Sequence, residues 1–223
     1  IDLTTTKSLY DGGSSSARTL TKSGGGVLRM TGSSGLTTGT FKIAAGTVLA
    51  DNTSGSATGK STVKVGNGAT LGGIGAIGGV SGSSAANVSL ASTSGSSLAT
   101  LAPGTIDGAK RVHVIGTLTV GSAAQTNNVT FGNHSRLRVT VGGDGGHDRL
   151  TVYGALSLAT ENDHLEVLAH EKVKPGVYTL ASATGGISGT FDTAEIPEGT
   201  WLTYSATTVE CNVPSWASMI LMR

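Results

Sequence analysis

Residues 62–80 read TVKVGNGATLGGIGAIGGV, a stretch with the pattern of short strands and sharp turns and none of a helix. Val63 and Val65 alternate with polar neighbours, which is the two-residue period of a strand with one apolar face. The Asn-Gly pair at 67–68 is typical of a tight turn. Glycines then separate the apolar residues up to position 77, where a chain that turns every few residues leaves little room for a Cβ. The stretch therefore predicts one coil of a β-solenoid.

The composition of the 223 residues favours a narrow core that is built in layers. Glycine accounts for 35 residues and proline for 4, which argues against collagen and against a polyproline linker. Because aromatic residues make up only 4% of the chain, Val, Leu, Ile and Ala must fill the core. The net charge of +1 lacks the electrostatic footprint of proteins that bind nucleic acid. No run approaches the ~18 apolar residues of a membrane span, so we expect no direct span.

Apolar strand centres recur along the chain with a period of roughly 20 residues, as expected when each coil is one repeat stacked on the last. Six residues define this period and are expected to point into one continuous core: Leu28, Leu49, Leu71, Leu118, Val139 and Leu158. The first three follow one another at about one such period each, and so do the last three. The sequence therefore predicts an all-β protein with the stacked coils of a β-solenoid.

Three regions are expected along this fold. They are an N-terminal extension and possible exchanged strand at 1–18, the β-helix coils at 19–190, and a modified C-terminal cap with a tail at 191–223. The cap is expected because Phe191, Trp201, Tyr204 and Trp216 gather large side chains near one end of the chain. Such residues would close an otherwise open hydrophobic column.

Glycine-rich motifs across residues 19–210 resemble the autotransporter-associated β-strand repeat in their order and spacing. The motifs are LTKSGGGVL at 20–28, TVL at 47–49, DNTSG at 51–55, VGNGATLGG at 65–73, GAIGG at 75–79, LAPG at 101–104 and GTLTV at 116–120. Residues 148–154, 174–180 and 187–191 are similar to the C-terminal rungs of such passengers. The resemblance implies a right-handed, single-stranded parallel β-helix that is secreted and displayed at a bacterial surface. It implies no particular activity.

We expect neither a metal site nor a cofactor. Residues 142–150, GGDGGHDRL, approach the calcium-binding nonapeptide of β-rolls, but the aspartate falls one residue late and the motif occurs once. A corner between two strands is the simpler interpretation. No pair of histidines has the spacing of a metal cage, and all five are expected to face solvent. They are His113, His134, His147, His164 and His170.

We also expect no catalytic site, although polysaccharide-cleaving β-helix enzymes are a serious alternative. Such enzymes need carboxylates gathered on one face. Residues 52–106 contain no Asp or Glu at all. The acids that lie about one coil apart and would have to act together are Asp144, Asp148, Asp163 and Glu166. The single cysteine, Cys211, excludes an internal disulfide, and we expect it to be a structural thiol.

The functional hypothesis concerns the chain ends. Six apolar residues there are expected to mediate self-association: Ile1, Leu3, Trp216, Met219, Ile220 and Leu221. A solenoid exposes unpaired backbone at both ends, which is a template for head-to-tail addition. The hypothesis is a non-enzymatic, extracellular bacterial structural protein whose partner is itself, in a surface filament or layer. The alternative is an autotransporter-type adhesin, a monomeric rod that contacts a host or cell-surface glycan or protein.

Overall fold

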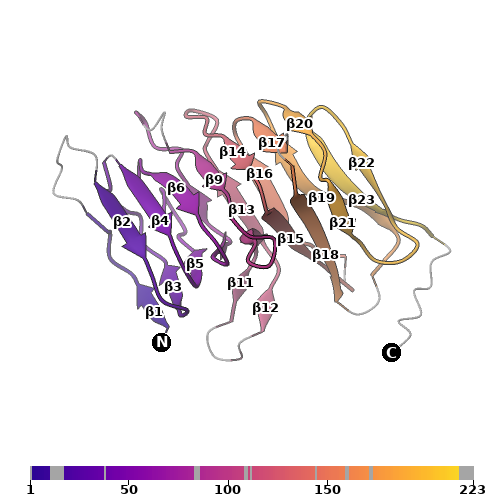
Figure 1. Ribbon diagram of the computed structural model, residues 1–223, viewed down its shortest axis with the longest axis horizontal. Coiled ribbons are helices and arrows are strands. Elements are labelled where there is room, and N and C mark those ends of the chain that lie inside the picture. The colour runs from indigo at the N-terminus through magenta and orange to yellow at the C-terminus, as the bar shows by residue number, and fades with distance from the viewer. Residues whose placement is uncertain are drawn as a thin grey trace.

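The computed structural model describes residues 2–10, 18–37, 39–82, 86–107, 110, 112–143, 145–158, 161–170 and 173–215. Within these residues the chain is all-β, with 23 strands and no helix (Figure 1). No helix long and apolar enough to cross a membrane is therefore present in the described ranges.

Most strands belong to three long sheets (Figure 1). The eight-stranded sheet runs, in spatial order, β1 (Leu3–Thr5), β3 (Val27–Met30), β5 (Thr47–Ala50), β7 (Thr70–Gly73), β10 (Ala99–Pro103), β15 (Ser135–Gly142), β18 (Asp163–His170) and β21 (Thr193–Glu195). The seven-stranded sheet runs β2 (Thr19–Lys22), β4 (Thr40–Ile43), β6 (Thr62–Val65), β9 (Val88–Leu90), β14 (Val129–Phe131), β17 (Leu156–Leu158) and β20 (Ile187–Gly189). The six-stranded sheet runs β22 (Trp201–Tyr204), β23 (Thr208–Val213), β19 (Gly176–Ala183), β16 (Arg149–Val152), β13 (Thr117–Val120) and β8 (Ala76–Ile77). A separate hairpin joins β11 (Thr105–Ile106) to β12 (His113–Val114).

The chain adds strands to these sheets in a repeating order. From β13 onward each pass contributes one strand to every sheet, as β13, β14 and β15, then β16, β17 and β18. Earlier passes form strands mainly on two sides, and backbone hydrogen bonds stack the irregular third side, for example from Ala57 N–H to the Ala76 carbonyl at 2.8 Å. The eight- and seven-stranded sheets are parallel throughout. The prediction of an all-β fold with parallel sheets is thus confirmed, and the arrangement is compatible with a β-solenoid.

The stretch at residues 62–80 forms β6, β7 and β8 with corners between them. Gly68 follows β6 with φ of +66°, and Gly73 ends β7 with φ of +123°. A Cβ at Gly73 would clash with the backbone carbonyl of Ala50 in the coil below. Glycine is required there both by the backbone conformation and by the close approach of two coils.

One ladder of aligned apolar residues runs through the eight-stranded sheet. From β1 to β21 its members are Leu3, Leu28, Val48, Leu71, Leu101, Leu137, Leu165 and Ala194. The step along the chain is much longer from Leu101 to Leu137 than from Leu28 to Val48. The longer step contains the β11–β12 hairpin and a regular third strand. The expected period of roughly 20 residues therefore describes the N-terminal coils and not the later ones.

Four of the residues expected in the core lie in it. Leu71, Leu118, Val139 and Leu158 are all buried within the hydrophobic core cluster. However, Leu118, Val139 and Leu158 belong to three different sheets, through β13, β15 and β17. Their nearly even spacing is therefore the number of residues from one side of the solenoid to another, and not the number of residues in a whole coil.

The other two expected core residues differ from the prediction. Leu28 is in the ladder but only partly buried, because it lies near the N-terminal end. Leu49 is buried but points to the opposite side of its strand, where its register partners are Arg29 and Gly72. Val48 occupies the core position that was expected of Leu49.

Candidate functional site at the ends of the solenoid

The N-terminal end of the solenoid is formed by β1 and β2, the outermost strands of their sheets (Figure 1). β1 pairs with β3 in a parallel register that aligns Leu3 with Leu28. Beside it, Asp2 Oδ1 accepts a hydrogen bond from the backbone N–H of Val27 at 3.2 Å. The outer edge of each strand has no strand partner in the described part of the chain. Residues 3–5 thus form the outermost strand of the eight-stranded sheet at this end.

An open apolar cleft lies at this end. Its volume is about 570 Å³, and Leu3, Leu9, Leu20, Leu28 and Phe41 are among its lining residues. Leu3 is 61% exposed and Leu20 is 39% exposed, whereas Phe41, one coil further in, is buried. The hydrophobic column that fills the solenoid therefore opens to solvent here, as far as the described residues extend.

At the opposite end, β20, β21 and β22 are the outermost strands. The six-stranded sheet turns antiparallel there, because β23 inserts between β19 and β22. Leu202 and Tyr204 of β22 pack partly buried against the core. Phe191 meets Phe131 edge-on, with 5.6 Å between ring centres. Trp201 remains 49% exposed. This end is covered by large side chains, while β20 and β21 keep an outer edge without a strand partner in the described ranges.

A buried carboxyl group, Asp163, lies close to this cap. Its Oδ1 accepts a hydrogen bond from the backbone N–H of Asp192 at 3.0 Å, and its Oδ2 has no hydrogen-bond partner among the described residues. Burial raises the pKa of Asp163 to about 6, and the negative charge of Asp192 also raises it. Burial likewise raises the pKa of the Tyr204 phenol. The cap therefore contains a carboxyl group that takes up a proton in mildly acidic solution.

Charge is divided along the length of the molecule. Residues 12–106 contain six Lys or Arg residues and a single acid, Asp51. Residues 161–215 contain eight acids and two lysines. The N-terminal coils are therefore net positive and the C-terminal coils net negative, although the whole chain carries only +1. Opposite potentials at two surfaces steer them into contact.

The structure describes one of the six residues expected to mediate self-association. Leu3 lines the N-terminal cleft. The other five lie outside the described residues: Ile1, Trp216, Met219, Ile220 and Leu221.

Sequence reasoning missed other apolar residues at the N-terminal end. Tyr10 is 69% exposed and lines a second hollow of about 250 Å³, together with Leu9 and Leu20. No sequence pattern marks these residues, since their exposure depends on which strand is outermost. The division of charge, in contrast, can be found from the sequence, because charged residues can be counted directly along the chain.

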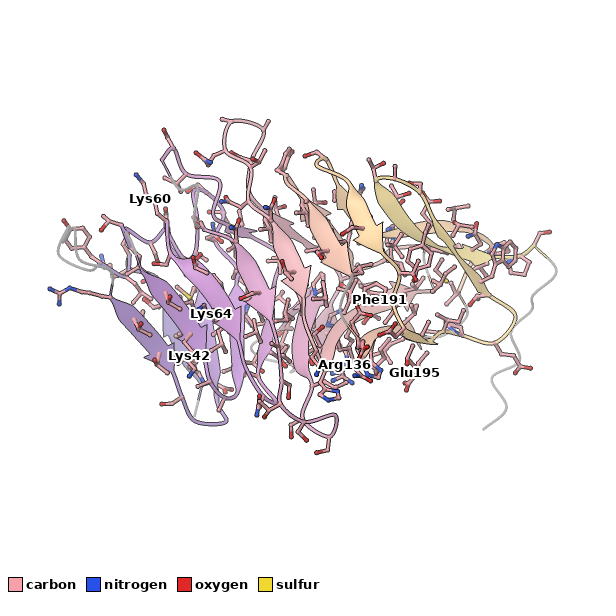
Figure 2. The ribbon with its side chains drawn as sticks, turned by 45° about the horizontal axis from the view of Figure 1, so that its top comes forward. Lys42, Lys60, Lys64, Arg136, Phe191 and Glu195 are labelled. Carbon is pink, nitrogen blue, oxygen red and sulfur yellow. The ribbon has the colours of Figure 1, made fainter. Side chains whose placement is uncertain are left out.

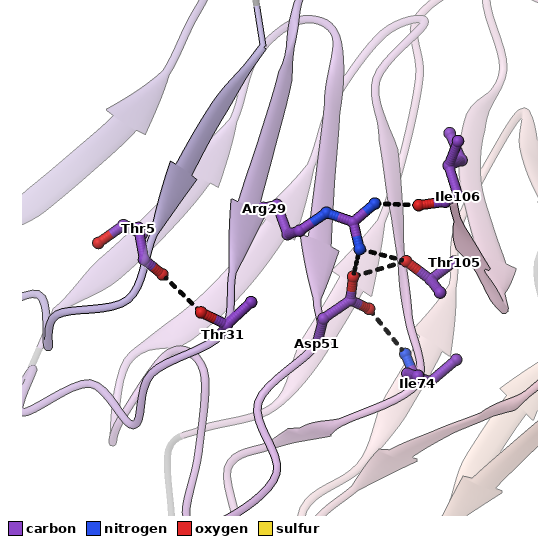
Figure 3. Close-up of polar contacts among 7 residues, drawn as sticks. All are labelled: Thr5, Arg29, Thr31, Asp51, Ile74, Thr105 and Ile106. Carbon is purple, nitrogen blue, oxygen red and sulfur yellow. Dashed lines mark hydrogen bonds and ion pairs between the residues drawn. The ribbon is translucent and has the colours of Figure 1, made fainter. Parts of the chain in front are cut away.

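Acidic side chains away from the ends hold neighbouring coils together. Asp51 accepts hydrogen bonds from the side chains of Arg29 and Thr105, both at 2.5 Å, and from the backbone N–H of Ile74 at 3.2 Å (Figure 3). Arg29 also donates to the carbonyl of Ile106 (Figure 3). The network ties the β11–β12 hairpin to β3 and to the corner after β7.

Asp148, which belongs to the glycine-rich motif at 142–150 and to the acids of the catalytic alternative, is buried and engaged by three donors. Its two oxygens accept hydrogen bonds from the backbone N–H groups of Gly116 at 3.0 Å and Thr140 at 2.9 Å. The same carboxylate pairs with His113 Nε2 at 2.7 Å. This carboxylate therefore fixes the start of β13 and the β12 strand to β15.

The structure describes two of the three remaining acids of the catalytic alternative, Glu166 and Asp163, and they lie in different surroundings. Glu166 forms ion pairs with Arg136 at 2.9 Å and Arg138 at 2.7 Å. Asp163 is buried beneath the cap, and Asp144 lies outside the described residues. No group of three or more His, Cys, Asp or Glu side chains is arranged to hold a metal ion, within the ranges that the structure describes.

Two of the five histidines make specific contacts within the chain, although His113 is exposed as expected. His113 pairs with Asp148, and His147 Nε2 lies 3.1 Å from the carbonyl oxygen of Thr179. The His147 ring also meets the Tyr178 ring edge-on, with 5.4 Å between centres. Cys211 is free and buried in β23, and burial raises the pKa of its thiol.

No protein-family model matches the chain, and a search of curated proteins also found no match. Function must therefore be inferred from the residues and the geometry of the chain itself.

Proposed function

We propose that this chain is a subunit of an extracellular bacterial structural protein, without enzymatic activity, that stacks end to end into a surface filament or layer. Its fold in this proposal is a right-handed, single-stranded parallel β-helix like that of autotransporter-associated repeat proteins. The observation that carries the proposal is the presence of open parallel edges at both ends, β1 and β2 at one and β20 and β21 at the other.

The two ends fit each other in strand direction. Every strand of the eight- and seven-stranded sheets runs parallel to its neighbour, so β1 of one copy can pair with β21 of the next, and β2 with β20. Leu3 of the second copy would then extend the apolar ladder that ends at Ala194. Such a contact joins two different surfaces and does not close on itself, so it propagates into a filament.

Apolar burial and charge both favour this contact. Covering the exposed parts of Leu3 and Leu20 removes apolar surface from water, where full burial of one leucine side chain is worth about 1.5–3 kcal/mol. The partner end carries the acid-rich coils and faces the end that has most of the unbalanced cations. The attraction between unlike ends disfavours head-to-head pairs, in which like charges would meet.

The non-enzymatic part of the proposal is supported by the bonds that the acids make. Asp51, Asp148 and Glu166 each accept hydrogen bonds or ion pairs from groups on other strands, which is a structural role. The alternative function is that of a monomeric adhesive rod. The regular polar outer face of the seven-stranded sheet favours that alternative, since it offers a long surface for contact.

Substitution in the N-terminal cleft tests the proposal. In the variant Leu20→Glu a charge replaces a half-exposed leucine, so the fold should survive while the cleft repels the acidic end of another copy. We expect light scattering to show particles that grow with wild-type concentration and a monomer for this variant. Both proteins should give the same circular dichroism spectrum.

A matched substitution away from the ends is the control. Val112→Glu changes an exposed apolar residue beside the β11–β12 hairpin and should assemble like the wild type. If the wild type stays monomeric at high concentration, the filament proposal is wrong and the adhesin alternative replaces it.

A further inference from the structure

We propose that the outer face of the seven-stranded sheet, in its N-terminal half, binds an acidic polysaccharide through Lys42 and Lys64. These residues lie in β4 and β6, on the side of the solenoid (Figure 2). The site therefore does not depend on contacts between the ends of different copies.

Lysines and hydroxyl groups line this face in register. From β2 to β14 the aligned residues are Thr21, Lys42, Lys64, Ser89 and Thr130. Apart from Lys22, their neighbours along each strand are apolar, and most of these are buried, so the alternation turns this row outward. Adjacent strands are about 4.8 Å apart, which places a polar group at each regular step along the solenoid.

The two lysines are direct register partners and both are exposed. Like charges in directly opposite positions of a sheet destabilise it. No carboxylate of the described residues lies within ion-pair distance of either ammonium group. The single acid between residues 12 and 106 is Asp51, which is engaged by Arg29 in another sheet. An anion bound across the two lysines would remove this repulsion.

A second pair of neighbouring cations shows how the chain balances such charge elsewhere. Arg136 and Arg138 lie on the same face of β15, and Glu166 of the adjacent strand forms an ion pair with each of them. Figure 2 shows Arg136 and Glu195 in the C-terminal half, apart from Lys42 and Lys64. Intramolecular neutralisation occurs at the arginine pair, whereas no carboxylate in the described part of the chain provides it at the lysine pair. The lysine charges are therefore available to a ligand.

The surrounding side chains indicate a carbohydrate polymer. A second aligned row of hydroxyl-bearing residues, Thr19, Thr40 and Thr62, runs beside the lysines on the same strands and can exchange hydrogen bonds with sugar hydroxyls. Single-stranded nucleic acid is usually held by aromatic rings that stack on bases, and a lipid surface by apolar side chains that enter it. The two rows present threonine, serine and lysine instead. These side chains repeat at the spacing of adjacent strands, about 4.8 Å, and such a regular row suits a linear polymer.

The test is the affinity of the full chain for dextran sulfate, polygalacturonate and neutral dextran, measured by titration calorimetry. We expect the wild type to bind the two acidic polymers and not neutral dextran. The variant Lys42→Thr/Lys64→Thr should bind at least about tenfold more weakly, and its affinity should depend less on salt. The variant Lys64→Glu, which pairs with Lys42 across the strands, should fold at least as stably and also lose binding.

The control variant Lys110→Thr/Lys174→Thr removes the same charge from two exposed lysines elsewhere and should keep its affinity within about twofold. Equal losses in the control and the Lys42/Lys64 variants would overturn the proposal, because net charge alone would then explain binding. Absence of wild-type binding to both acidic polymers would overturn it as well. So would tighter binding to single-stranded DNA or to anionic vesicles than to either acidic polymer.

Discussion

At the scale of single residues, Asp163 is a buried carboxyl group whose hydrogen bonds replace only part of the contact with water that burial removes. One carboxyl oxygen accepts a backbone hydrogen bond and the other has no partner among the described residues. The pKa of this group is raised from 3.8 to about 6, chiefly by burial. A raised folded-state pKa means that the folded form holds its proton more tightly than the unfolded chain does. The stability that this group contributes is therefore fully present below about pH 3.8 and is lost as the pH rises through about 6.

The variant Asp163→Asn should remove this dependence. The asparagine oxygen can keep the hydrogen bond from Asp192, and no charge has to be buried above pH 6. We expect the variant to be more stable than the wild type near pH 7.5, by about 1–3 kcal/mol, with the difference shrinking toward pH 4. Urea unfolding at several pH values measures it. A variant that is less stable than the wild type near pH 7.5 would show that the ionised carboxylate makes a favourable contact.

Single residues also show where the sequence pattern is ambiguous. The strand Thr47–Ala50 has three apolar residues in a row, so alternation alone cannot tell whether Val48 or Leu49 faces the core. Register decides the matter, because Val48 aligns with the core residue Leu71 and Leu49 aligns with Gly72. Shifting an assignment by one residue moves a side chain to the other face of the sheet. The sequence therefore predicts the strand and leaves its orientation open.

At the scale of elements, strands that alternate cleanly could be predicted from sequence. Residues 62–65 and 117–120 have one apolar face each and form β6 and β13. The assembly of strands into coils could not be predicted as well, because coil length varies. N-terminal coils carry strands mainly on two sides, while later coils carry three and include the β11–β12 hairpin. A fixed period therefore pairs residues on different sides of the solenoid, as it does for Leu118, Val139 and Leu158.

Leu118 gives a test of the core at this scale. It is buried in β13, and its register partner in β16 is Leu150. Truncation to alanine leaves a cavity that the rigid neighbouring strands cannot fill, so Leu118→Ala should lower the free energy of unfolding by about 2–5 kcal/mol. The matched truncation Leu20→Ala removes a half-exposed side chain and should cost less than about 1 kcal/mol. Equal losses for both variants in urea unfolding would contradict the assigned core.

At the scale of the whole molecule, the candidate site could be predicted only in outline. Leu3 was expected to mediate self-association as an apolar residue near a chain end, and the structure places it in the cleft. Tyr10 and Leu20 were missed, since their exposure follows from which strands end the sheets. The opposite charge of the two halves is visible in the sequence, but the whole-chain charge of +1 conceals it. Together the edges, the cleft and the charges make the two ends of the solenoid different and complementary.

Cysteine cross-linking between two copies tests the head-to-tail contact most directly. Thr4 in β1 and Glu195 in β21 belong to one outward row of the eight-stranded sheet, so stacking in register would bring them together across the contact. One protein carries Thr4→Cys and a second carries Glu195→Cys, and the two are mixed under mild oxidation, with the buried Cys211 unchanged. The proposal predicts a disulfide between the two different variants and little product from either alone. Cross-linking of Thr4→Cys to itself, or no cross-link in the mixture, would contradict it.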